Sequence, residues 1–254
     1  MHKQHGLSII EMMVALVISS FLIIGITQVY LDNRENTLFQ QSQGQNIDNA
    51  RFSILLLEQT LAKAGYRRAP DEAMETAFPS ATIGACGPMD AGQVVKPLSH
   101  TSFCIRYQPA FPDARDCTGD NIPNIPASPY VAAPAVTEIV SLSDGNLTCS
   151  QAGGAEQELA SNIEGLRFFY GSNNNEEKRI ETYSETPNKN IRAVQFSIIT
   201  ASSTEVAKSP GSAAYSFWHK AKPGTNTVGA PIPDSDKRLY TMLSSSSSMR
   251  NLLP

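Results

Sequence analysis

The side chains that could support catalysis are few and scattered. The chain has four histidines, His2, His5, His100 and His219. The first two lie in a short N-terminal segment for which we predict removal, and the other two are isolated. A histidine-based triad or a multi-histidine metal site needs several such groups placed together. Because the sequence also lacks a glycine-rich phosphate loop, we expect a protein that is not an enzyme.

The four cysteines point to disulfide chemistry. Cys86, Cys104, Cys117 and Cys149 are widely spaced, and none forms the close pair that is typical of a zinc site. An even number of such cysteines beyond a membrane-targeting segment indicates two disulfides in an oxidising compartment. Four free, buried thiols are the alternative. Three pairings are possible, and we favour Cys86–Cys104 with Cys117–Cys149 because each closes a moderate loop.

A small group of carboxylates is the remaining candidate for metal binding. Asp113, Asp116 and Asp120 offer the oxygen ligands that calcium prefers. Their loop lacks the 12-residue pattern of an EF-hand, and a solvated loop is the simpler interpretation. We assign no metal and no cofactor.

Charge argues against nucleic acid as the main partner. The chain has 254 residues, a formal net charge of -4 and no long basic run. Binding to a phosphate backbone needs clustered lysine and arginine. The length allows one large domain or a domain with an anchor.

The most informative charge is Glu11, which stands at the mouth of a long apolar stretch. From Met12 to Leu31 there is no charged residue for 20 positions, which as a helix covers about 30 Å, the hydrocarbon thickness of a bilayer. An ordinary secretory signal peptide is the alternative, but its apolar core is shorter and a small-residue cleavage site follows it. A carboxylate in such a helix is costly unless it has a partner.

The first residues resemble the class III prepilin signature. Its elements are a short basic leader, a glycine, a hydrophobic residue, and a glutamate four positions further on at the start of an apolar helix; here these are residues 1–6, Gly6, Leu7 and Glu11. The resemblance implies cleavage between Gly6 and Leu7 by a prepilin peptidase, and N-methylation of Leu7. Family members more often have phenylalanine at the position of Leu7.

Cleavage would create the missing partner for Glu11. The new amine at Leu7 lies about one helical turn from the carboxylate, and in a stack of parallel helices it can meet the Glu11 of a neighbour. A paired charge is tolerable in an apolar filament core, whereas an unpaired one is strongly unfavourable. The alternative is that Glu11 only marks the membrane interface.

The apolar stretch begins a longer helix. Helix-forming residues dominate as far as Ala64, and no proline occurs before Pro70. Apolar residues recur at steps of three and four between Ile47 and Ala64, which predicts an amphipathic helix. We expect one helix from about Ser8 to Gly65; two helices broken near Gly44 are the alternative.

The rest of the chain is typical of a β-rich head. We expect residues 67–101 to be irregular and 244–248, a serine run, to be a mobile loop or a solvated strand end. The expected strands are 102–108, 137–142, 146–149, 163–170, 180–183 and 193–200, with 215–218 and 239–243 as edge pieces. Ser143-Asp144-Gly145 indicates a hairpin turn, which brings Cys149 back toward the loop of Cys117.

Several head segments are similar to those of PilW-type minor pilins. They are Asn33-Arg34, Arg51-Phe52, Ala64-Gly65-Tyr66, Ile105–Gln108, Asp116–Gly119, Asn162–Gly171, Ile191–Phe196 and Arg250-Asn251.

This resemblance implies an α+β, type IV pilin-like fold, with a long N-terminal helix packed on an antiparallel β-sheet head. Its parts would be a leader (1–6), a transmembrane and filament-core helix (7–31), an amphipathic second half (32–66) and an extracytoplasmic head (67–254). The implied function is that of a minor pilin that helps to initiate, prime or cap type IV pili.

The resemblance also implies partners and a location. The partners would be other minor pilins, the major pilin, the prepilin peptidase and a tip adhesin. The chain would sit in the inner membrane, with its head in the periplasm, before it enters the extracellular fibre. A minor pseudopilin of a type II secretion system is the related alternative, and a membrane-anchored enzyme or sugar-binding head is the more distant one.

Overall fold

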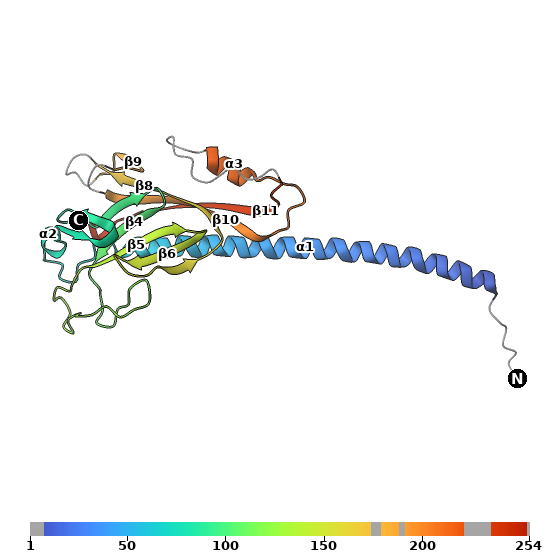
Figure 1. Cartoon of the computed structure of the whole chain (residues 1–254), viewed down its shortest axis with the longest axis horizontal. Helices are drawn as coiled ribbons and strands as arrows, with labels where there is room; N and C mark the ends of the chain where they lie inside the picture. Colours follow the sequence, from blue (N-terminus) through green and yellow to red (C-terminus); the bar gives the residue numbers. More distant parts are fainter. Residues whose placement is uncertain (1–7, 174–178, 188–190, 221–234, 253–254) are drawn as a thin grey trace.

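One long helix dominates the computed structural model, which describes residues 8–173, 179–187, 191–220 and 235–252. Helix α1 runs without interruption from Ile9 to Lys63 and passes through both Gly25 and Gly44. The expectation of a single helix is therefore confirmed, and the alternative of a break near Gly44 is wrong. Figure 1 shows α1 leaving one end of the head and extending far beyond it.

The helix ends where the sequence predicts a stop. Gly65 has a φ of 72°, a backbone conformation that favours glycine, two residues after the last helical residue. The chain then runs beside strand β4 (Ser102–Tyr107), because the Gly65 N–H donates to the Arg106 carbonyl at 2.9 Å. The motifs around Gly65 and Arg106 are thus in direct contact.

The head contains two antiparallel sheets and a small hairpin. The five-stranded sheet has the order β3-β4-β5-β6-β7, with β3 (Val95–Ser99), β5 (Val136–Ser143), β6 (Asn146–Gln151) and β7 (Gln157–Ala160) beside β4. The four-stranded sheet has the order β11-β10-β8-β9, with β8 (Ile163–Ser172), β9 (Thr182–Ser184), β10 (Ile191–Glu205) and β11 (Arg238–Ser248). The hairpin pairs β1 (Ala81–Ile83) with β2 (Gly87–Met89), joined by η1 (Gly84–Cys86).

The main core lies where the two sheets and the end of α1 meet. Phe103 from one sheet and Phe168 from the other make an edge-to-face contact with centroids 4.8 Å apart. Leu57 and Leu61 of α1 belong to the same core and are almost fully buried. Burial of each such side chain contributes roughly 1.5–3 kcal/mol. The last third of α1 is therefore an integral part of the head.

A third layer covers the outer face of the four-stranded sheet. Residues 215–218, which we expected to be an edge strand, instead belong to helix α3 (Ala213–Lys220). Tyr215 and Trp218 are three positions apart, so in a helix both face the sheet, where they pack with Ile199. A short apolar run does not distinguish helix from strand by its pattern, which explains the error.

One further expectation needs correction. Residues 67–101 are not irregular, since they hold the short helix α2 (Met74–Ala77) and strands β1, β2 and β3. The serine run is a strand end, one of the two forms expected for it: it completes β11 and pairs with residues 193–197 of β10. Backbone hydrogen bonds do not depend on the side chain, and the Ser245 hydroxyl also donates to Glu58 of α1.

The fit between α3 and β8 gives a testable prediction. A methyl group at Gly165 would overlap the ring of the buried Trp218, which also stacks on the Arg167 guanidinium at 3.8 Å. We expect Gly165→Ala to lower the free energy of unfolding by about 1–3 kcal/mol. Gly154→Ala is the matched control, because its added carbon makes only ordinary contacts. Urea denaturation of the full-length protein in detergent measures both, and equal stability of the two variants would contradict the packing described.

Candidate functional site: the N-terminal helix and its junction with the head

The first turn of α1 places Glu11 at the N-terminal end of the helix. Gly6 and Leu7, the residues of the expected cleavage site, lie outside the described residues. Glu11 is exposed, and its carboxylate accepts a hydrogen bond from the Ser8 backbone N–H at 3.0 Å. A carboxylate at this end of a helix is favourably placed for unsatisfied N–H groups and for any positive charge nearby. Among the described residues, the partner of the Glu11 carboxylate is the neighbouring Ser8.

The helix that follows is apolar on every face and has no cover from the head. No residue from Ser8 to Gln45 is buried. An 18-residue window of α1 has a mean hydropathy of 2.5, and none of that window is buried. By length and composition this helix can cross a membrane.

A polar collar, residues 32–45, separates the apolar segment from the head. The collar contains Asp32, Arg34 and Glu35, and four of its later residues are glutamines. Its residues are exposed or half-buried, although helical structure continues through it. The apolar segment is therefore held at a distance from the head by about 20 Å of polar helix.

Asn46 begins the contact between α1 and the head. It is 2% exposed, and its side-chain amide donates to the Leu239 carbonyl at 2.9 Å and to the Thr241 hydroxyl at 3.2 Å. Both acceptors belong to β11, so the amide holds the helix against the edge strand of the four-stranded sheet. A buried polar group that finds such partners fixes the position of a helix more narrowly than apolar contact does.

Glu138 contacts the C-terminal end of α1. It is fully buried on β5, and one carboxylate oxygen accepts from the Tyr107 hydroxyl at 2.6 Å and from the Cys117 N–H at 2.8 Å. The second oxygen lies 3.6 Å from the ammonium of Lys63, the last residue of α1. Burial, and then the Glu138 carboxylate, raise the pKa of Tyr107, so the phenol keeps its proton and donates it to the hydrogen bond. Glu138 thereby joins the helix, the five-stranded sheet and the loop of Cys117.

The C-terminal end of the chain completes this junction. The Asn251 side-chain amide donates at 3.0 Å to each of the Ala62 and Ala64 carbonyls, which lie at the end of α1. Such terminal carbonyls have no partner within a helix. The Arg250-Asn251 motif that the sequence singled out is therefore part of the helix stop.

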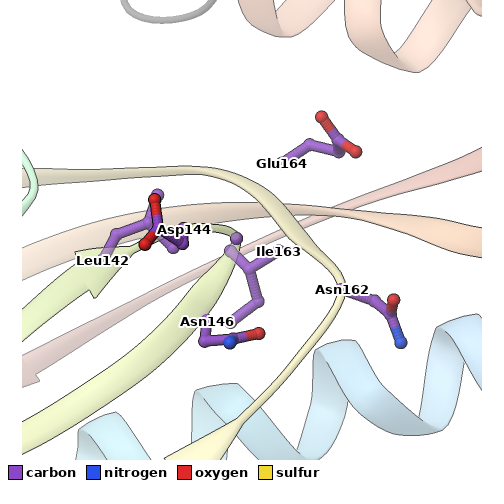
Figure 2. A pocket seen from close by; sticks show the side chains of 7 residues that line it. Leu142, Asp144, Asn146, Asn162, Ile163 and Glu164 are labelled. Carbon is purple, nitrogen blue, oxygen red and sulfur yellow. The ribbon is translucent and has the colours of Figure 1, made fainter. Parts of the chain in front are cut away.

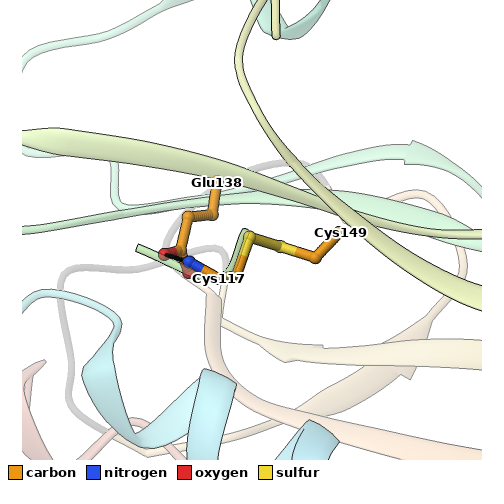
Figure 3. A group of neighbouring side chains, drawn as sticks. All are labelled: Cys117, Glu138 and Cys149. Carbon is orange, nitrogen blue, oxygen red and sulfur yellow. Dashed lines mark hydrogen bonds between the residues drawn. A yellow bond between two sulfur atoms is a disulfide. The ribbon is translucent and has the colours of Figure 1, made fainter. Parts of the chain in front are cut away.

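The head contains two disulfides, and one of them lies beside Glu138. Cys86 is bonded to Cys104 and Cys117 to Cys149, the two pairs that the sequence favours. Cys117, Glu138 and Cys149 are close enough together to suggest a metal site, as Figure 3 shows. Their two sulfurs are joined in the disulfide, and a metal requires thiolates. The arrangement is therefore a covalent staple next to a buried carboxylate.

The carboxylates considered for calcium are used within their own loop. Asp116 accepts hydrogen bonds from the backbone N–H groups of Thr118 and Asp120, from the Thr118 hydroxyl and from the Gln151 amide. Burial alone would raise the pKa of Asp116, but these hydrogen bonds outweigh it and hold the pKa below its usual range. Asp113 is exposed. The loop is thus ordered by internal hydrogen bonds, and we assign it no ion.

A polar cavity of about 450 Å³ lies at the end of the head that faces the collar. Figure 2 shows it between the β5–β6 turn, with Asp144 and Asn146, and the start of β8, with Asn162 and Glu164. Glu164 forms an ion pair with Arg238. The lining contains no basic side chain and no nucleophile with a neighbouring base, so it gives no support to catalysis. His100, one of the two isolated histidines of the head, is half-buried elsewhere, next to β3 and β4.

Comparisons with known proteins agree with both ends of this architecture. Residues 1–27 match the family model of the prokaryotic N-terminal methylation motif, and residues 130–251 match that of the type IV pilus-assembly protein W. By these two matches the chain is similar to PilW-type, type IV pilin-like proteins. A type IV-like pilin from Thermus thermophilus aligns with 81% of this chain and 97% of its own, at 11% identity and a TM-score of 0.48. No curated protein sequence matches.

Two residues at the contact between α1 and the head were not predicted from the sequence. Asn46 and Glu138 were not singled out. The available signal for Glu138 is a carboxylate inside an otherwise apolar strand, which needs a buried partner. The sequence gives a weaker indication that Asn46 is buried, because asparagine in a helix is common at surface positions.

The junction can be tested by removing its central carboxylate. Glu138→Ala leaves the Tyr107 hydroxyl and the Cys117 N–H without their buried acceptor, so we expect a loss of about 1–3 kcal/mol in unfolding free energy. Lys63→Ala should cost less than about 1 kcal/mol, because the lysine side chain is 37% exposed and its charge is screened. Glu156→Ala, at an exposed position, is the control. Urea denaturation measures all three, and a Glu138 variant as stable as the control would refute the role of this carboxylate.

Proposed function

We propose that this chain is a minor pilin that leaves the inner membrane to enter a type IV pilus and helps to initiate its assembly. The observation that supports the proposal is the helix from Ile9 to Gln45, which its own head leaves uncovered. Sixteen large apolar side chains between Ile9 and Leu31 are exposed. Removing these side chains from water is favourable by roughly 1.5–3 kcal/mol each, which amounts to tens of kcal/mol for the segment. Lipid would cover them before assembly, and the helices of other subunits afterwards.

In this proposal the prepilin peptidase cuts between Gly6 and Leu7, and Leu7 is then methylated. Residues 1–6 are the leader, 7–31 the membrane-spanning and filament-core segment, 32–66 the second half of the helix and 67–254 the periplasmic head. The Glu11 carboxylate then pairs with the Leu7 amine of a neighbouring subunit. Its place at the very start of the helix, within reach of the Ser8 N–H, supports this pairing because it lies next to the bond that would be cut.

The partners follow from the same arrangement. Other minor pilins, the major pilin and a tip adhesin would contact the chain in the fibre, and the peptidase would contact it in the membrane. A minor pseudopilin role in a type II secretion system is the second candidate. The match of residues 130–251 to the pilus-assembly family favours the pilus.

Processing gives the first test of this proposal. Intact-mass analysis of protein from a piliated host should show a chain that begins at methylated Leu7. Gly6→Val should leave the full-length precursor in the membrane, because the bulky side chain occupies the position before the cut. Gln4→Val, elsewhere in the leader, is the matched control and should be processed. A mature start within or after the apolar segment would overturn the proposal.

Glu11 gives the second test. Glu11→Leu should insert and be cut, but it should enter pili poorly, because a desolvated amine without its counter-charge costs about 3–5 kcal/mol. Glu11→Gln keeps a hydrogen-bond acceptor for Ser8 and loses only the charge, so it should fail in the same way. Glu35→Leu, in the collar, should behave as wild type. Immunoblots of sheared pili against membranes provide the readout, and normal incorporation of both Glu11 variants would rule out the charge pair.

A further inference from the structure

The loop between β4 and β5, residues 108–135, is unusually long for a connection without strands of its own. Loops of this length in compact domains are commonly functional or disordered. This one is ordered at several points: the Cys117–Cys149 disulfide, the hydrogen bonds of Asp116, and the Arg68 guanidinium, which donates to the Ser128 carbonyl at 3.1 Å. Ile122 is buried in the main core. The loop is therefore held as a fixed surface.

The loop presents one aromatic side chain in an unfavourable backbone conformation. Tyr130 has a φ of 61°, follows a proline in a tight turn and is 75% exposed. A proline followed by a residue with positive φ is typical of a type II turn, which normally has glycine or asparagine at the second place. Earlier in the same loop, Pro123 and Asn124 form such a pair, and there the residue with a φ of 61° is an asparagine.

A bulky residue in this conformation is disfavoured, and such positions are retained mainly where function requires them. The Tyr130 ring gains little in return from its own head, since most of its surface is exposed. Contacts within the head therefore offer the ring little compensation for this conformation.

The chemistry around Tyr130 indicates what this partner is. From Asn121 to Thr137 the chain has no ionisable group other than the Tyr130 phenol. Pro129, Val131 and Ala132 next to it are exposed and apolar. Nucleic acid and anionic lipid both need cations, and a sugar site needs amides or carboxylates beside its aromatic ring. An uncharged aromatic anchor among prolines and alanines fits an apolar protein surface.

The position of the loop indicates which kind of protein would contact it. It adjoins β4 and β5 at the level of Gly65, where α1 ends, whereas the free helix leaves the head at the level of Asn46. Figure 1 shows this loop at the end of the molecule opposite the N-terminus. The start of α1 is about 80 Å away along the helix. In a stack of parallel helices, this end of the head faces the subunits that lie ahead of it in the fibre.

We propose that Tyr130 anchors this head to the head of another pilin-like subunit that lies ahead of it. The proposal rests on the proposed function as a pilin, and it adds the surface and the kind of partner. The rigid loop lowers the ordering cost of association, which is the energetic advantage of holding the tyrosine in its strained turn. Because residues 121–137 carry no charge, the contact should depend little on salt.

Site-specific photocrosslinking in a piliated host tests this contact in the full-length chain. A benzoyl-phenylalanine at position 130 should give an adduct with a second protein that begins at a methylated, prepilin-type N-terminus. The same residue at Tyr183, an exposed tyrosine on β9, is the matched control and should give at least about tenfold less adduct if Tyr130 is a hot spot. An adduct with a polysaccharide or a non-pilin protein, or equal yields at the two positions, would overturn the proposal.

A substitution separates this role from a purely structural one. Tyr130→Asn keeps a residue that accepts the turn, as Asn124 does, and removes the ring. The thermal midpoint should stay the same or rise, while recovery of the partner on the tagged chain should fall by about 30-fold. Tyr130→Phe should retain the partner. A lower thermal midpoint for Tyr130→Asn with unchanged partner recovery would show a structural role and contradict the proposal.

The two proposals fail in different ways. If the pilin proposal is wrong, the chain is not cut after Gly6 or is not found in the fibre. If only the Tyr130 contact is wrong, the chain is still processed and still enters pili, and position 130 gives no adduct above the control.

Discussion

The apolar surface of the first half of α1 is the constraint on which the rest of the molecule depends. Between Ile9 and Leu31 the helix is apolar all round, and no part of the head reaches it. Such a surface is unstable in water, so the chain needs lipid or other helices around it at every stage. The single carboxylate at its start, Glu11, adds a requirement for a positive partner once the helix leaves the interface. The matches to the N-terminal methylation motif and to the type IV pilus-assembly protein W are consistent with both demands.

The C-terminal third of α1 is fixed to the head. Asn46 and Glu138 lie at the two ends of the docked part, and both use buried polar contacts. Apolar contact from Leu57 and Leu61 supplies most of the energy between them, whereas the polar groups set the position. The Cys117–Cys149 disulfide holds the loop whose N–H completes the Glu138 site. Buried polar contacts therefore hold both ends of the docked part of α1 to the head.

The sequence predicted the helix and most of the central strands, because their patterns depend on local periodicity. The β5–β6 turn is an example, since Asp144 and Gly145 both have positive φ and such a pair has a specific preference for this hairpin. Helix α3 was missed because its short apolar run fits a strand as well as a helix, and only packing on Ile199 decides between them.

The junction was predictable only in part. The end of α1 near Gly65 could be predicted, because glycine adopts the positive φ that stops a helix. The Arg250-Asn251 motif was identified in the sequence, but its contact with the end of α1 was not predicted. Glu138 and Lys63 are 75 positions apart in the chain, so no local pattern reveals that they meet. Cleavage at Gly6 and the pairing of Glu11 stay predictions, because they depend on an enzyme and on a second subunit.

The central claim, that α1 exchanges lipid for other helices, is tested most directly by labelling single cysteines along the helix. Positions from Met12 to Tyr30, and positions in the collar from Asn33 to Gln43, are replaced one at a time and exposed to a membrane-impermeant maleimide. In membranes the first set should be protected and the collar labelled. In intact pili both sets should be protected, because neighbouring helices would then surround the whole free part of α1. Labelling of the apolar segment in membranes, or of the collar in pili at the level seen in membranes, would contradict the account.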